Sequence, residues 1–181
     1  RGLIDHSDSL GATARFGRGD AQWLTAGRGV VHSEMFPLVH PDGPNDLHLF
    51  QIWLYLPAED KFVDPYFTML WSEEIPVVTR TDAEGRTTTI TVIAGALDEA
   101  RPLPLPPNSW GARPESDLAI WNLHLEPGAT VALPAATGPD TVRTLYLYEG
   151  TSLRIGGTEV AGNTGTLVRA DPVGWPLRLA T

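Results

Sequence analysis

His32 and Glu34 are the residues whose types and spacing point most directly to chemistry. They lie two positions apart in the segment GRGVVHSEM, residues 27–35, which opens with Gly-Arg-Gly and continues through two valines. Alternate side chains of a β-strand share a face, so the imidazole and the carboxylate would point the same way. Nitrogen and oxygen donors that converge inside a β-barrel suit iron, manganese or zinc. A His-x-Glu pair in a strand is also common as a surface pair, or as a buried histidine with its hydrogen bonds satisfied.

The other histidines are scattered singly along the chain. His48 stands in the apolar run LHLFQIWLYL, residues 47–56, and we expect it either to line the cavity near the His-x-Glu pair as a substrate contact or to be buried against backbone. His6 lies in DHSDS, whose Asp and Ser residues favour a turn, and it is not expected to be a ligand. His40 and His124 are expected to be exposed.

Composition limits the classes of function. The net charge of −9 disfavours direct binding of DNA or RNA, although it permits a basic protein partner. The absence of cysteine excludes disulfides and thiolate metal sites, so a metal would take nitrogen and oxygen ligands. No apolar run approaches the ~18 residues of a membrane span, and no signal peptide is visible. We therefore expect a cytoplasmic protein without membrane contact. The preference for Arg over Lys indicates a bacterial genome.

The strand and turn pattern predicts an all-β fold. Strands are expected at residues 47–56, 87–94, 121–125, 130–133, 142–148, 152–155, 165–169 and 175–179, with an irregular proline-rich loop over residues 101–114. The run at 47–56 is apolar on both faces, which predicts burial on both sides. Residues 59–70 could contain a short helical turn.

A weak internal repeat aligns Arg1-Gly2 with Glu149-Gly150, each followed by short strands and glycine turns. Two copies of such a unit indicate duplicated jelly rolls. The join is expected near residues 70–76, which gives an N-terminal domain over 1–72 and a C-terminal domain over 73–181. Because the first copy lacks its leading strands, we expect the N-terminal barrel to be incomplete and those strands to lie upstream of Arg1.

Three segments carry a family resemblance. DHSDSLG (residues 5–11), GDAQWLTAGRGVVHSEM (19–35) and LHLFQIWLYLPAEDKFVDPYF (47–67) resemble the hallmark segments of the pirin family, two-domain members of the cupin superfamily. The resemblance implies a bicupin, that is, two stacked jelly-roll β-barrels, of which the first binds one metal, usually iron, through three histidines and one glutamate.

On that resemblance His32 is the third imidazole ligand and Glu34 is the carboxylate ligand. Glu34 is also the candidate catalytic residue, and His48 is the candidate substrate contact. The expected ion is a divalent transition metal, Fe(II) before others. The sequence departs from the family pattern because it contains no His-x-His pair. The site is therefore expected to be incomplete without histidines upstream of Arg1, and the C-terminal domain is expected to be metal-free.

Two functions follow from the resemblance. One is a dioxygenase of the quercetin 2,3-dioxygenase type, which opens a small aromatic flavonol with O₂ at an iron that keeps open positions. The other is a regulator, in which a metal- or redox-dependent surface binds a transcription factor or a metabolic enzyme. The residues alone do not decide between them.

Overall fold

The computed structural model of the chain describes residues 2–137, 141–169 and 177–181. All strand pairs within these residues are antiparallel, and the helical elements are single 3-10 turns. The all-β expectation is confirmed. No helix in the described ranges is long and apolar enough to cross a membrane.

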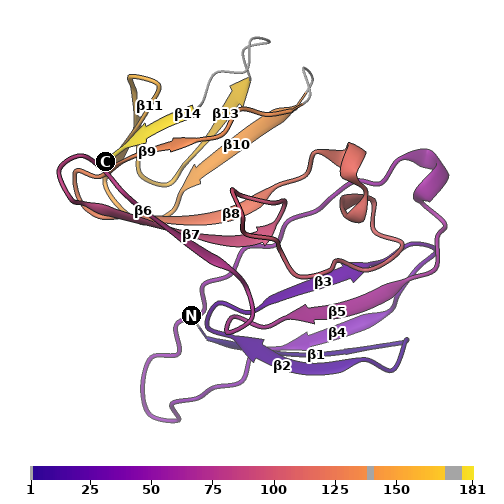
Figure 1. The fold of residues 1–181 in the computed structure, drawn as a ribbon. Coiled ribbons are helices and arrows are strands. Elements are labelled where there is room, and N and C mark those ends of the chain that lie inside the picture. Colours follow the sequence, from indigo (N-terminus) through magenta and orange to yellow (C-terminus); the bar gives the residue numbers. More distant parts are fainter. Residues whose placement is uncertain (1, 138–140, 170–176) are drawn as a thin grey trace. The chain divides into compact units, whose positions relative to one another are not determined.

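The chain forms two compact units. The first combines Arg1–Ile75 with Pro102–Ser116, and the second combines Pro76–Arg101 with Asp117–Thr181 (Figure 1). The expected domains, 1–72 and 73–181, stay a prediction. The structure groups the proline-rich segment 102–116 with the first unit, although the segment lies within the expected C-terminal domain.

The first unit contains a three-stranded sheet in the order β2-β1-β4. Its strands are β1 (Leu3–Asp8), β2 (Thr13–Gly17) and β4 (His32–Met35). The β1–β2 hairpin aligns Leu3 with Gly17 and Ser7 with Thr13. Since β1 lies in the centre and β4 at an edge, β1 supplies the backbone against which the His-x-Glu strand is aligned.

A second pair of strands, β3 (Ala21–Thr25) and β5 (Tyr66–Leu70), completes the regular structure of this part of the chain. The turn after β3 packs closely on the chain before β5. Gly27 has a φ of +49°, and a Cβ there would lie 2.1 Å from the carbonyl oxygen of Val63. The amide of Arg28 donates to that same oxygen at 3.0 Å. Only glycine fits this approach, which gives the Gly-Arg-Gly sequence a structural role.

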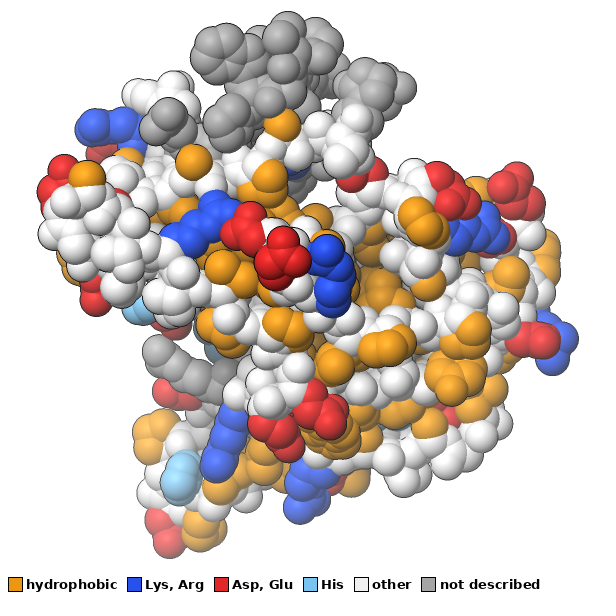
Figure 2. Space-filling view, in the orientation of Figure 1, with side chains coloured by type: hydrophobic (Ala, Val, Ile, Leu, Met, Phe, Trp, Pro, Cys, Tyr) orange, Lys and Arg blue, Asp and Glu red, His pale blue; other side chains and the backbone are white. Residues whose placement is uncertain are grey.

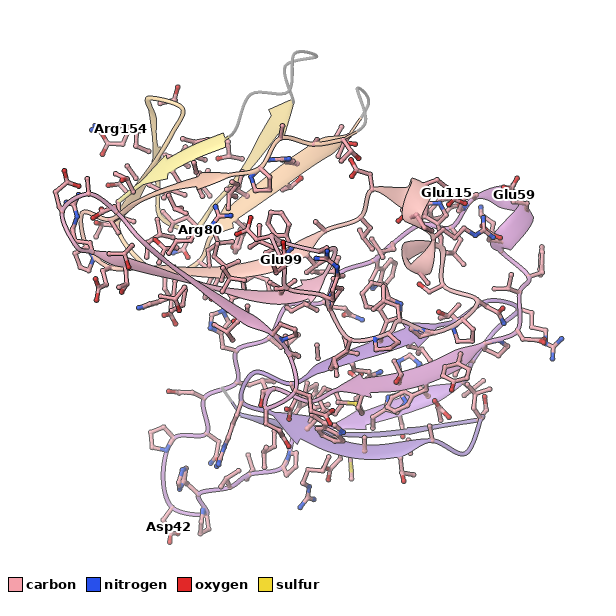
Figure 3. All side chains as sticks on the ribbon, in the orientation of Figure 1. Asp42, Glu59, Arg80, Glu99, Glu115 and Arg154 are labelled. Carbon is pink, nitrogen blue, oxygen red and sulfur yellow. The ribbon has the colours of Figure 1, made fainter. Side chains whose placement is uncertain are left out.

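The proline-rich segment is tied to the first unit by side-chain hydrogen bonds. The indole of Trp23 donates to Ser109 Oγ at 3.1 Å, and Arg113 donates to the buried Asp60 carboxylate at 2.5 Å. Asp60 belongs to η1 (Ala58–Asp60), and Arg113 separates η2 (Trp110–Ala112) from η3 (Pro114–Ser116). Figure 3 labels Glu59 and Glu115 on two of the turns that this ion pair links. The loop predicted over residues 101–114 is irregular over residues 101–109, whereas η2 and the start of η3 lie in the rest of the range.

The expected strand over residues 47–56 is wrong. The segment is irregular, and its large apolar side chains are exposed, up to 85 % for Trp53 and 86 % for Tyr55. Hydrophobic side chains are visible on the surface in Figure 2 among charged ones. An apolar pattern on both faces is typical of a strand that is covered on both sides. No described strand pairs with this segment. Residues 59–70 contain the η1 turn and also strand β5, which was not expected.

The second unit has the larger hydrophobic core. Its sheets are β6-β7-β8, β12-β11-β14-β9 and the pair β10-β13. The bounds are β6 (Val77–Thr81), β7 (Thr87–Ala94), β8 (Ile120–Leu125), β9 (Thr130–Leu133), β10 (Val142–Leu147), β11 (Ser152–Ile155), β12 (Thr158–Ala161), β13 (Thr164–Arg169) and β14 (Leu177–Ala180). Apart from residues 47–56, each predicted strand coincides with one of these to within two residues at its described ends. The start of the 175–179 prediction lies outside the described residues.

Strand β7 shows why the core forms here. Every second residue is buried along its whole length, from Thr88 to Ala94. Ile90 and Val92 are completely buried and join a cluster with residues of β9, β11 and β14, among them Leu153 and Leu179. Burial of each such side chain contributes roughly 1.5–3 kcal/mol. Arg80, labelled in Figure 3, ties β6 to this layer by donating to the carbonyl of Ala132 and to Asp98.

The turn between β6 and β7 is organised by Asp82. One carboxylate oxygen accepts from the amides of Glu84 and Arg86, and the other accepts from the Arg86 side chain and the Thr130 amide. Burial raises the pKa of Asp82, but these hydrogen bonds lower it by more, so the net pKa lies below the ordinary value of 3.8. The folded state therefore favours the ionised carboxylate.

Replacing Arg113 tests the anchor of the proline-rich segment. Arg113→Ala leaves the buried Asp60 carboxylate without its cation, and we expect the free energy of unfolding to fall by about 2–3 kcal/mol. Arg28→Ala is the control, because Arg28 and its partner Asp64 are 65 % and 67 % exposed, and such pairs contribute about 0–1 kcal/mol. Urea denaturation followed by tryptophan fluorescence measures both, and equal losses would contradict the anchor.

Asp82 gives a prediction of pH dependence. A carboxyl whose pKa is depressed by folding stabilises the protein above its unfolded pKa, and that contribution is lost as the pH falls through the folded pKa. We expect Asp82→Asn to lower the melting temperature at neutral pH and to flatten its decline below the ordinary pKa of 3.8. Glu84→Gln, which alters a carboxylate that is 63 % exposed, should leave the acid response unchanged. A parallel shift of the Asp82→Asn curve at every pH would contradict this account.

Candidate metal-binding site

The β1–β4 pairing brings four polar side chains together. Its register sets His6 opposite Glu34 and Asp8 opposite His32. Directly opposed residues of an antiparallel pair share a face, as do residues two apart on one strand. The pairing continues beyond β4, where the amide of Ser9 donates to the carbonyl of Val31 at 2.8 Å. The expectation that His32 and Glu34 share a face is confirmed.

His6 lies at the centre of this group. Its side chain is fully buried, and its ring stacks on that of His32, with centroids 5.6 Å apart, and on that of Phe67, with centroids 4.8 Å apart. Nε2 donates to Asp8 Oδ2 at 3.1 Å, and Nδ1 lies 3.9 Å from Glu34 Oε1. The amide nitrogen of Gln22 approaches Nδ1 at 3.4 Å. Residues of β3, β4 and β5 therefore all contact this one imidazole.

Asp8 holds the end of β1. One carboxylate oxygen accepts from the amides of Leu10 and Ala12 in the β1–β2 turn, and the other accepts from His6. Burial raises the pKa of Asp8, but the hydrogen bonds from His6 and the two amides lower it by more. An ionised Asp8 accepts hydrogen bonds only, so Nε2 of His6 carries the proton of this hydrogen bond.

His6 is the residue that the sequence interpretation missed. The Asp and Ser residues around it favour a turn, but the segment Leu3–Asp8 forms a strand. The alternation of Ile4, His6 and Asp8 is the one local signal for that strand. Nothing local indicates that His6 lies opposite Glu34.

The described residues do not enclose the His-x-Glu pair, and its expected inward setting stays a prediction. All four residues of β4 are exposed, and the Glu34 side chain is 32 % exposed. The physical reason is that β4 is an edge strand, paired along one side in the described structure. The two side chains are accordingly accessible to ligands from solution.

His48 lies in the irregular segment 47–56, is exposed, and packs its ring against Phe50 with centroids 5.4 Å apart. His40 and His124 are exposed as expected. A role of His48 in substrate binding stays a prediction.

The residues fit a divalent transition metal in ligand type but not in number. An accessible imidazole and carboxylate on one face are suitable donors for such an ion. The described residues hold no group of three or more His, Asp or Glu side chains placed to bind one ion. His6 Nδ1 lies 3.9 Å from Glu34 Oε1, but the described residues do not group His6 with the pair as a three-ligand site.

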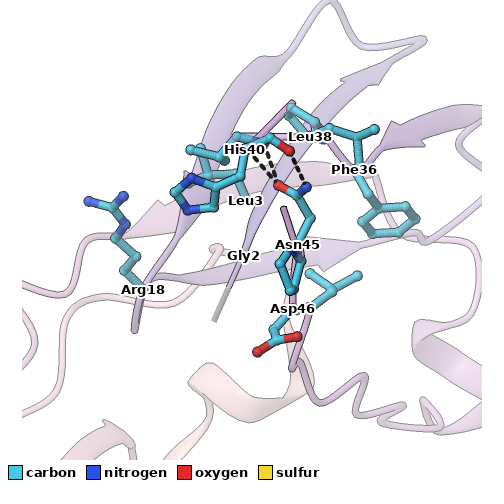
Figure 4. Close-up of a pocket in the computed structure, with 12 residues that line it drawn as sticks. Gly2, Leu3, Arg18, Phe36, Leu38, His40, Asn45 and Asp46 are labelled. Atoms are coloured by element: carbon cyan, nitrogen blue, oxygen red, sulfur yellow. Dashed lines mark hydrogen bonds between the residues drawn. The ribbon is translucent and has the colours of Figure 1, made fainter. Parts of the chain in front are cut away.

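A separate pocket of about 240 Å³ lies beside the loop that follows β4. Asn45 shapes it by accepting from the amides of Val39 and His40 and donating to the carbonyls of His40 and Gly43 (Figure 4). Its wall includes Arg18 and Asp46 but not His32 or Glu34. The pocket is therefore distinct from the His-x-Glu face.

Comparisons with known proteins agree on a family. The model of the family described as Pirin matches residues 1–54. A Pseudomonas aeruginosa protein named "putative quercetin 2,3-dioxygenase" is 33 % identical over 138 residues, which are 76 % of this chain and 44 % of that protein. A second protein of that name from the same organism is 32 % identical over 167 residues, covering 90 % of this chain and 53 % of its own length. The chain thus spans about half the length of these relatives.

A solved structure shows the same fold. The crystal structure of a quercetin 2,3-dioxygenase from Acinetobacter baumannii superimposes with a TM-score of 0.74 at 20 % identity, covering 99 % of this chain and 52 % of that one. At this identity the likeness concerns the fold alone.

Asp8 gives a test of how the site is held. Asp8→Ala leaves two turn amides and the buried His6 ring without their acceptor, and we expect the free energy of unfolding to fall by about 2 kcal/mol. Asp5→Ala, which removes a carboxylate bonded to the 63 % exposed Arg15, should cost much less. Chemical denaturation measures both variants. A loss at Asp8 no larger than at Asp5 would show that Asp8 does not organise this end of β1.

Proposed function

This chain belongs to the pirin family, and we propose that it forms part of a metal-dependent dioxygenase acting on flavonol-type aromatic substrates. The observation that carries the proposal is the pairing of an accessible His32 and Glu34 on one face of β4. The names of the Pseudomonas aeruginosa relatives support the reaction class.

The proposed architecture is a bicupin whose N-terminal barrel, residues 1–72, carries the metal and whose C-terminal barrel, residues 73–181, does not. The fold likeness to the Acinetobacter baumannii structure, of which this chain covers 52 %, supports it. In this proposal, strands outside these 181 residues complete the barrel, and histidines on those strands complete the set of metal ligands. We further propose a cytoplasmic location.

His32 and Glu34 would hold the ion, with Fe(II) the proposed metal. A bound divalent ion with open positions supplies a Lewis acid for a deprotonated hydroxy-ketone. Glu34 is the proposed catalytic residue, since a partly exposed carboxylate can accept the proton of a substrate hydroxyl. His48 would contact the aromatic body of the substrate, beside Phe50.

A regulator is the second candidate, and it uses β4 as an accessible strand, as the strand is in the described residues. A metal held by His32 and Glu34 at an open edge strand would alter a surface that a protein partner can reach. Exposed apolar side chains in the neighbouring segment, such as Phe36 and Leu38, extend that surface. The partner would be a transcription factor or a metabolic enzyme.

Oxygen uptake distinguishes the two candidates. With saturating Fe(II) and quercetin, we expect the full-length protein, which supplies the remaining histidines of this proposal, to consume O₂. In that protein we expect Glu34→Ala to reduce the rate at least ~100-fold, as for loss of a general base. Glu59→Ala, which removes an exposed carboxylate on η1 (Figure 3), should keep the full rate.

Iron loading without O₂ uptake on any flavonol would contradict the enzyme and favour the regulator. Metal binding by this chain is itself expected to be weak, because two protein ligands leave most positions to water. Tight stoichiometric binding that survives the Glu34→Ala change would show that other residues are the ligands.

A further inference from the structure

The buried His6 ring contacts both members of the proposed ligand pair. It stacks on His32, and its Nδ1 lies 3.9 Å from Glu34 Oε1. Resting on the proposed metal-binding role of that pair, we infer that His6 is a positioning residue that restrains the His32 ring and the Glu34 carboxylate before any ion binds.

The surroundings of His6 fix its own orientation. Nε2 is bound to the Asp8 carboxylate, and Gln22 approaches Nδ1, so both edges of the ring are engaged. Phe67 from β5 stacks on the same ring with an interplanar angle of 18°. A side chain held by a carboxylate, an amide and an aromatic ring loses most of its rotamer freedom. It presents a rigid surface to β4.

The ligand pair needs such a support. His32 and Glu34 lie on an exposed edge strand, where side chains ordinarily sample several rotamers. Ordering a side chain at a binding site costs conformational entropy, and a preformed arrangement avoids that cost. His6 restrains both side chains from the neighbouring strand β1. We assign it a supporting role, because the described residues form no group of three ligands that includes it.

Two substitutions separate the contributions of His6. His6→Gln retains a nitrogen that can donate to Asp8 but removes the stacked ring. His6→Phe retains a ring against His32 but removes both hydrogen bonds. His124→Gln is the matched control, since His124 is an exposed histidine of β8 in the second unit. Circular dichroism and thermal melting establish that each variant is folded.

The first measurement uses the metal-free protein. We expect the His32 ring proton resonances to shift in His6→Gln, because the neighbouring ring that shields them is gone, and to stay closer to wild type in His6→Phe. A His32 spectrum that does not change in His6→Gln would overturn the inference, as it would show that His6 does not orient that ring.

The second measurement is a titration with Co²⁺. Loss of a residue that orients metal ligands typically costs 10–100-fold in metal affinity, and we expect a drop of about that size for His6→Gln and none for His124→Gln. Wild-type affinity and an unchanged cobalt absorption spectrum in His6→Gln would overturn the inference. If the wild-type protein binds no Co²⁺ at all, the proposed metal role fails, and the His32 resonances alone decide the positioning role.

Discussion

The antiparallel register of β1 with β4 is the constraint on which the site depends. It places His6 opposite Glu34 and Asp8 opposite His32, while Ser7 and Ser33 face each other on the other side, with their hydroxyls 3.0 Å apart. Because side chains alternate along a strand, a slip of one residue would turn the His-x-Glu pair to the opposite face. The stacked rings, the Asp8 hydrogen bonds and the accessible ligand pair all follow from this one alignment.

Local signals were sufficient for much of the fold. Strands β7, β9 and β11 coincide with the predicted ranges, because their β-branched or alternating residues and flanking turns are readable along the chain. The same alternation correctly placed His32 and Glu34 on one face. The family resemblance, carried by long segments, gave a membership that the comparisons confirm.

Features that depend on distant partners were not readable. The apolar run 47–56 has the composition of a buried strand, but a strand also needs a neighbouring backbone, and no described strand pairs with it. His6 was assigned to a turn from its Asp and Ser neighbours, whereas its role follows from contacts with Gln22, His32 and Phe67 on three other strands. Residues 102–116 likewise join the first unit through hydrogen bonds that bridge long stretches of sequence.

A disulfide trap measures the β1–β4 register directly, since the chain contains no cysteine of its own. Residues Ser7 and Ser33 are direct cross-strand partners, and the Cα atoms of such partners lie within the reach of a disulfide. The double variant Ser7→Cys with Ser33→Cys should therefore oxidise to an intramolecular disulfide, detected as a loss of free thiols under denaturing conditions. Ser7→Cys with Met35→Cys, a diagonal pair, should remain reduced. Free thiols in the first variant and a cross-link in the second would contradict the register, and with it the arrangement of His6, His32 and Glu34.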